Sequence, residues 1–282
     1  MIVLIQNQKI SAQINSLGAE LIRLNNADTS FIWTIDEQYW NKTSPILFPI
    51  VGRLKNDSYT LNEVQYSLAR HGFARNFEFA IVTKKENSVT FSLSENQETL
   101  VQYPFLFELQ ICYTLVENKL VISYLVKNNS NQKMPFSIGA HPAFAIDYDL
   151  TNYAIEFEKE EELIAHELEN EQFSGKTKRI TLKNKTLPLS YSLFEKDAIV
   201  LKKLISKNII ILKKQLPYLK INFGNFPNLG IWTKNNAPFL CIEPWHGYAD
   251  SANANGRIED KEGIIVINKG DSFETSFSVE IL

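Results

Sequence analysis

The sequence predicts an all-β protein, an antiparallel sandwich or barrel, and three observations carry this prediction. Apolar side chains recur with a period of two along residues 105–115 and again along 120–126, which is typical of a long antiparallel hairpin. The same alternation runs through residues 273–281 at the C-terminus. Convincing helical periodicity is scarce, so the strands are not separated by the helices that a βαβ sheet requires.

Shorter strand candidates follow one another along the rest of the chain. Residues 36–40 fit a single helical turn, and residues 160–170 have a helical composition with a weak apolar face. The polar stretch 166–190 is expected to be a surface excursion. In chain order, the remaining strand candidates are 1–6, 8–15, 19–25, 77–83, 88–94, 134–140, 154–158, 198–204, 208–213, 219–223, 229–233, 239–243 and 263–267.

Length and composition fit one large domain spanning residues 1–282. The chain is 44% hydrophobic and 12% aromatic, which is enough apolar material for a sizeable core. No internal repeat interrupts the sequence, and no linker divides it. We therefore expect a single β domain.

The charge distribution excludes two classes of partner. The formal net charge is −3, and acidic and basic residues are interspersed rather than clustered. Nucleic acids and anionic membrane surfaces are bound by a concentrated positive field, which this sequence lacks. The N-terminus has no features of a signal peptide, and no apolar run is long enough to span a bilayer. A cytoplasmic protein is the resulting expectation.

The two cysteines and the absent motifs bear on cofactors. Cys112 and Cys241 each lie within an apolar, strand-like run, which favours buried free thiols over a disulfide. The sequence contains no glycine-rich nucleotide loop and no paired-cysteine or His-Glu-x-x-His metal motif. We expect neither a cofactor nor a metal.

The four histidines are the first candidates for chemistry. His166 lies in an acidic segment and is expected on the surface. His71, His141 and His246 each lie beside a glycine or proline and near a large aromatic ring. One such histidine is more often structural, but three with similar surroundings favour polar groups presented into a concave, aromatic-lined pocket. Such a pocket suits a sugar, whose C–H faces stack on rings while its hydroxyls form hydrogen bonds.

A glutamate, an aspartate and an arginine complete the candidate set. Glu243 ends an apolar run at 239–242, where a carboxylate is costly to bury without partners, and Pro244 is expected to stop the strand there. Asp197 directly precedes another apolar run, which is also an ordinary position for a loop aspartate. Arg53 follows an apolar run and a glycine, and a surface position fits it equally well.

Histidine and carboxylate together indicate general acid–base catalysis. Histidine exchanges a proton readily near neutral pH, and a carboxylate supplies the complementary base. A glycosidase remains an alternative, because such enzymes use two carboxylates and Asp197 and Glu243 are available. A sugar-binding protein without catalysis is a second alternative.

Four segments give the chain a resemblance to a known family. The chain resembles the aldose 1-epimerases (galactose mutarotases), and most closely their LacX-like branch. The resemblance implies a large antiparallel β-sandwich, the galactose mutarotase-like supersandwich, with the sugar in an open cleft. The segments are 48–53, 71–75, 139–144 and 241–245, which read FPIVGR, HGFAR, GAHPAF and CIEPW.

The resemblance also implies a reaction and roles. The reaction is the interconversion of the α and β anomers of a free hexose, without a cofactor. Glu243 is similar to the base that deprotonates the anomeric hydroxyl, and His141 to the acid that protonates the ring oxygen. Further positions similar to substrate-binding residues are Arg53, His71 and Asp197, to which we add the ring of Trp245.

A second branch of the family resembles hexose-6-phosphate mutarotases, which add basic residues for the phosphate. Arg75 and Lys55 are the residues available for that role in this sequence. Both are nevertheless expected to be ordinary surface charges. A free hexose is accordingly the favoured substrate, and a hexose 6-phosphate the alternative.

Overall fold

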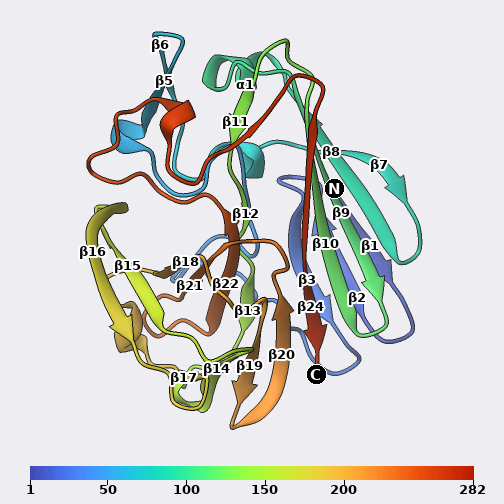
Figure 1. Ribbon diagram of the computed structural model, residues 1–282. Coiled ribbons are helices and arrows are strands. Elements are labelled where there is room, and N and C mark those ends of the chain that lie inside the picture. The colour runs from blue at the N-terminus through green and yellow to red at the C-terminus, as the bar shows by residue number, and fades with distance from the viewer.

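The computed structural model describes residues 1–282 and consists mostly of antiparallel strands, as predicted (Figure 1). The larger sheet has nine strands, among which β9 (Phe107–Val116), β10 (Lys119–Asn128) and β24 (Ser272–Ile281) are the longest. Its remaining strands are β17 (Thr186–Pro188), β14 (Tyr153–Phe157), β19 (Asn208–Lys213), β20 (Leu216–Asn222), β8 (Ser88–Ser94) and β7 (Ala80–Lys84).

The second sheet has eight strands and carries Glu243 and Trp245. Its central strand β22 (Phe239–His246) pairs with β21 (Asn228–Trp232) on one side. On the other side β22 pairs with both β12 (Ile138–Ala140) and β13 (Ala143–Ala145). The outer strands are β16 (Gln172–Ile180), β15 (Leu163–Glu169), β18 (Ile199–Lys202) and β4 (Ile46–Leu47).

Three small sheets complete the strand set. They account for the strands at the N-terminus and in the connecting loops. Their members are β1 (Ile2–Gln6), β2 (Ser11–Asn15) and β3 (Glu20–Asn25); β5 (Ser58–Leu61) and β6 (Val64–Ser67); and β11 (Met134–Phe136) and β23 (Ile265–Ile267).

The alternating pattern explains how the core forms. Along β9 and β10 every second side chain is buried, because successive residues of a strand point to opposite faces. A cluster of 67 buried apolar residues draws on both large sheets, including Phe277 of β24 and Ile242 of β22. Burial of this apolar surface is the main force that holds the two sheets together.

Helical structure is sparse, as the sequence indicated. The one α-helix, α1 (Gln97–Gln102), was not predicted; it begins at Asn96, whose side chain accepts hydrogen bonds from the backbone of Glu98 and Thr99. Residues 36–40 form a turn in which the N–H groups of Tyr39 and Trp40 donate to the carbonyl of Asp36. No helix combines the length and apolar character needed to cross a membrane.

One prediction of local structure was wrong around residue 165. The helical composition of 160–170 gives strand β15, because β16 and β18 offer ladder partners on both of its edges. The polar stretch 166–190 forms most of the β15–β16 hairpin followed by β17, and most of its residues are exposed or partly exposed. Tertiary pairing therefore overrides a weak local propensity.

The expectation that Pro244 stops a strand was also wrong. Strand β22 continues through Pro244 to His246. On one side of β22 the pairing is interrupted between Gly139–Trp245 and Ala143–Cys241. Pro244 lies within this interruption, where its missing N–H removes no ladder hydrogen bond.

Candidate functional site

His141 and Glu243 meet because of the register of β22. Gly139 faces Trp245 and Ala143 faces Cys241, so His141, between β12 and β13, lies opposite Glu243. The Nε2 atom of His141 is 3.1 Å from the Oε2 atom of Glu243. This is the distance of an ion pair, but the atoms are not aligned as a hydrogen bond, and Glu243 Oε2 has no hydrogen-bond partner.

Burial dominates the electrostatics of this pair. Glu243 is 1% exposed and His141 is 7% exposed. Burial raises the pKa of Glu243 well above its ordinary value, against an opposing effect of Arg70. Burial, followed by the positive charge of Arg70, lowers the pKa of His141 to about 3. Both shifts disfavour the charged forms, which leaves a single proton to be shared by two adjacent groups.

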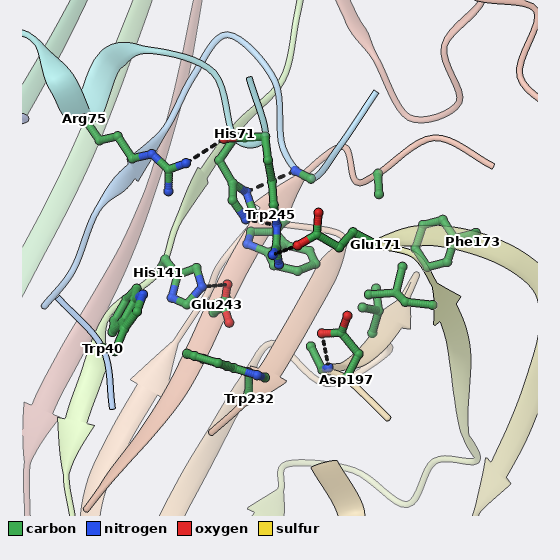
Figure 2. A pocket seen from close by; sticks show the side chains of 16 residues that line it. Trp40, His71, Arg75, His141, Glu171, Phe173, Asp197, Trp232, Glu243 and Trp245 are labelled. Atoms are coloured by element: carbon green, nitrogen blue, oxygen red, sulfur yellow. Dashed lines mark hydrogen bonds and ion pairs between the residues drawn. The ribbon is translucent and has the colours of Figure 1, made fainter. Parts of the chain in front are cut away.

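The pair lies in a cavity of about 180 Å³ (Figure 2). Three of the four tryptophans of the chain, Trp40, Trp232 and Trp245, line it. The rings of Trp40 and Trp232 lie 4.8 and 5.8 Å from the ring of His141. The cavity therefore combines aromatic faces with a few polar groups, which is the composition that suits a sugar ring.

Trp245 needs glycines on its neighbouring strands. A Cβ atom at Gly139 or Gly230 would come within 2.6 or 2.7 Å of the indole, so the ring lies flat against both strands. Its Nε1 atom is buried and has no hydrogen-bond partner. The sequence-based choice of Trp245 thus falls on a residue of the cavity wall.

His71 also lines the cavity, from the loop between β6 and the 3-10 turn at Ala74–Asn76. The Gly52 N–H donates to its Nδ1 at 3.1 Å. The Nε–H group of Arg70 donates to its Nε2, also at 3.1 Å. Burial, followed by the charge of Arg70, holds the pKa of His71 well below its ordinary value. His71 is therefore a neutral group beside the pair.

Arg53 lies outside the cavity wall. Its guanidinium donates to both carboxylate oxygens of Asp57, at 2.7 and 2.6 Å, and to Glu171 at 2.9 Å. Glu171 lines the cavity and also pairs with Arg70 at 2.5 Å. Arg53 is thus one residue removed from the cavity and acts on it through Glu171.

Asp197 lines the cavity from the loop that precedes β18. Its Oδ1 accepts a hydrogen bond from the Ala198 N–H at 2.7 Å. The second carboxylate oxygen is left without a protein donor in this contact, and it can accept from a ligand hydroxyl. The position fits the expected binding role, although the sequence around Asp197 gave little reason to single it out.

Arg75 and Lys55, both expected to be surface charges, are placed differently in the structure. Arg75 lines the cavity, donates to the backbone carbonyl of Arg70 at 2.6 Å and forms no ion pair with a carboxylate. Lys55 does not line it and donates to the carbonyl of Ala254. The surface assignment was therefore wrong for Arg75.

Sequence reasoning missed several residues of the cavity wall. Arg70 directly precedes the HGFAR segment, and its position next to His71 was a signal that could have been used. The hairpin β15–β16 contributes three residues that no local pattern marked. The missed residues are Trp40, Arg70, Leu168, Glu171, Phe173 and Trp232.

Two histidines are placed differently from the prediction. His246 is the first residue after Trp245 and points to the opposite face of β22, where it packs on Phe226 and Phe273. Its surroundings resembled those of His71 and His141 only in the residue types next to it in the sequence. His166, expected on the surface, is half-buried on β15 with its ring 5.9 Å from that of Phe173.

His246 gives a pH-dependent contribution to stability. Burial lowers its pKa from 6.5 to about 4. Between these values the unfolded chain binds a proton that the folded protein does not, so the free energy of unfolding falls as the pH falls from 6.5 to 4. Over this pH range we expect the free energy of unfolding of the His246→Gln variant to fall by about 1–3 kcal/mol less than that of the wild type.

Urea denaturation at several pH values measures this difference. The other histidines contribute equally to both proteins, so their effects cancel in the comparison. Parallel stability curves for wild type and variant would contradict the assignment of His246 as a partly buried neutral group.

One group of side chains near the pair is suited to hold a metal ion. His141, Cys241 and Glu243 are all buried, and their potential ligand atoms lie within 4.8 Å of one another. Imidazole, thiolate and carboxylate are the three ligand types that zinc uses in proteins.

Comparisons with known proteins identify the family and agree with the fold. The family model described as aldose 1-epimerase matches residues 1–266. The plasmid-encoded protein LacX of Lactococcus lactis subsp. lactis is 35% identical over 298 residues, covering 100% of each chain. A galactose mutarotase related enzyme from Lactobacillus acidophilus superposes with a TM-score of 0.95 at 30% identity, covering 100% of this chain and 97% of that one. A galactose mutarotase-like protein from Lactobacillus casei gives 0.95 at 29% identity, with 100% of both chains covered. The chain therefore belongs to the aldose 1-epimerase family and has its galactose mutarotase-like β fold.

Proposed function

We propose that this protein interconverts the α and β anomers of a free hexose by acid–base opening of the sugar ring. The observation that carries the proposal is the 3.1 Å contact between His141 Nε2 and Glu243 Oε2 at a cavity lined by tryptophans. A pyranose entering this cavity presents its anomeric hydroxyl and its ring oxygen, both bonded to C1, to the two groups together. Family membership supports the same reaction.

In the proposed mechanism, Glu243 removes the proton from the anomeric hydroxyl while His141 protonates the ring oxygen. The C1–O5 bond opens, and the resulting aldehyde rotates about C1–C2. Closure reverses the roles: His141 takes back the proton from the O5 hydroxyl, and Glu243 returns one to O1. Each turnover thus restores both groups.

The shared proton explains how the pair reaches its reactive form. In the empty cavity burial favours a neutral histidine beside a protonated glutamate. The reactive form has the same number of protons but is an ion pair, with Glu243 ionised and His141 charged. Sugar hydroxyls that form hydrogen bonds with these groups replace part of the lost solvation and shift the proton toward His141.

The neighbouring groups have supporting roles. Asp197 has an oxygen free to accept from a hydroxyl, and His71 adds a polar ring to the same cavity wall. Trp232 and Trp40 offer faces for the C–H groups of the ring. Arg70 is held by Glu171 and places its positive charge near the oxygen on which negative charge develops.

A hexose 6-phosphate is the second candidate substrate, and Arg75 is the observation that favours it. Its guanidinium lines the cavity without a carboxylate partner, so it is available for an anionic substituent. Glu171 argues against this assignment, because its negatively charged carboxylate already forms an ion pair with Arg70.

Saturation-transfer NMR on the metal-stripped protein tests the proposal. We expect the anomers of glucose or galactose to exchange faster with the protein than in buffer alone. For the hexose 6-phosphates we expect a smaller increase in the exchange rate, or none. Comparing Arg75→Gln with wild type separates the candidates, since a loss confined to the 6-phosphates would assign the arginine to phosphate binding. Binding by calorimetry without any exchange would instead identify a non-catalytic sugar-binding protein.

A further inference from the structure

Cys241 lies where the strand geometry adds a third ligand to the catalytic pair. It is two residues before Glu243 on β22, and side chains two apart in a strand point to the same face. Ala143, two residues after His141, is the direct partner of Cys241 across the ladder. The imidazole, thiol and carboxylate therefore converge on one spot of the sheet.

The geometry of the three donors fits a single ion of zinc size. Their ligand atoms lie within 4.8 Å of one another. Zinc bonds of about 2.0–2.3 Å in a tetrahedron place ligands roughly 3.3–3.8 Å apart, so side-chain shifts of about 1 Å suffice. All three residues are buried, and the structure offers no other cysteine near the pair.

Two atoms of this cluster lack protein partners. Glu243 Oε2 and His141 Nδ1 are buried without a hydrogen bond. Buried polar groups normally have a partner, which points to a ligand that the protein chain does not itself supply. A sugar satisfies such atoms during catalysis, and a cation satisfies the carboxylate when no sugar is bound.

We propose that His141, Cys241 and Glu243 form a binding site for a thiophilic divalent cation such as Zn²⁺. The cation enters from the cavity, and the cavity side leaves a fourth position open for water. Binding releases to solvent the thiol proton and the proton that His141 and Glu243 share. No oxidant or reductant takes part.

The site is inhibitory rather than catalytic. The ion takes the lone pairs with which Glu243 accepts and His141 exchanges protons, so a metal-loaded protein cannot open the sugar ring by these groups. This consequence rests on the proposed function, whereas the binding itself does not. The two claims are tested by separate measurements.

The two cysteines provide a matched pair of variants. Cys112 lies on β9 in the larger sheet, 3.5 Å from the hydroxyl of Thr114. Titration of the protein with Co²⁺ reports directly on thiolate ligation through the sulfur-to-cobalt charge-transfer absorption. We expect this absorption in wild type and in Cys112→Ser, and its loss in both Cys241→Ser and Cys241→Ala. Circular dichroism and thermal unfolding verify that each variant is folded.

Displacement of Co²⁺ by Zn²⁺ in a competition titration gives the affinity of the site for Zn²⁺. Loss of an outer-shell partner typically weakens metal binding by about 10–100-fold, so loss of a direct ligand should weaken it by at least as much. Charge transfer that persists in folded Cys241 variants, or no such absorption in wild type, would overturn the site. Zinc binding without slower anomer exchange would overturn only the inhibition, and an absence of exchange in metal-free protein would bear on the proposed function alone.

Discussion

Replacement of Glu243 by glutamine is expected to remove almost all of the anomerisation activity. The amide cannot accept the proton of the anomeric hydroxyl, although it keeps the shape of the side chain. A positioned acid or base contributes about 10²–10⁴-fold to rate, and we expect a loss in kcat/KM within this range. Polarimetry of fresh α-glucose or α-galactose, or NMR exchange, measures the effect.

The stability of this variant separates a chemical role from a structural one. Because burial raises the pKa of Glu243, its ionised form is unfavourable in the folded protein, and the carboxyl contributes stability only at low pH. Glutamine removes this penalty, so the free energy of unfolding at neutral pH should not decrease. The control is Glu274→Gln, an exposed change on β24. Full activity in Glu243→Gln would refute the assigned base.

Replacement of His141 by asparagine is expected to slow turnover about 10²-fold or more while leaving sugar binding largely intact. Asparagine can still donate a hydrogen bond to the ring oxygen but cannot transfer a proton to it. The loss should therefore appear in kcat rather than in the dissociation constant of the sugar. Anomer exchange measures the first quantity and calorimetry measures the second.

His166→Asn is the matched control for this variant, because His166 lies outside the cavity wall. It should retain the wild-type rate. Two results would contradict the role of His141: an unchanged rate, or a loss of rate that is matched by an equal loss of binding. The second result would make His141 a binding residue only.

The fold was largely readable from the sequence because strands leave a local signature. Alternation along 105–115, 120–126 and 273–281 corresponds to β9, β10 and β24, whose buried faces follow the same period. Segments whose identity depends on a partner were predicted poorly. Strand β15 has a helical composition, and β22 passes through Pro244 only because its neighbour is interrupted there.

The residues of the candidate site likewise differ in how far the local sequence could predict them. His71, His141, Glu243 and Trp245 stand out by their residue types and flanking residues, Asp197 was added only through the family resemblance, and all five line the cavity. Arg53 was chosen by the same reasoning but lies behind Glu171. Glu171 itself could not be found from the sequence, because its partner Arg53 is 118 residues away in the chain.

By itself, the sequence determined most of the segments that become strands, which of their faces are buried and which residue types are available for proton transfer. These properties depend on neighbours within a few positions along the chain. Only the tertiary structure decided that His141 lies beside Glu243, that His246 faces the opposite side of the sheet, and that Cys241 joins the pair. The reason is the register between strands distant in sequence: a shift of one residue would turn each of these side chains to the other face.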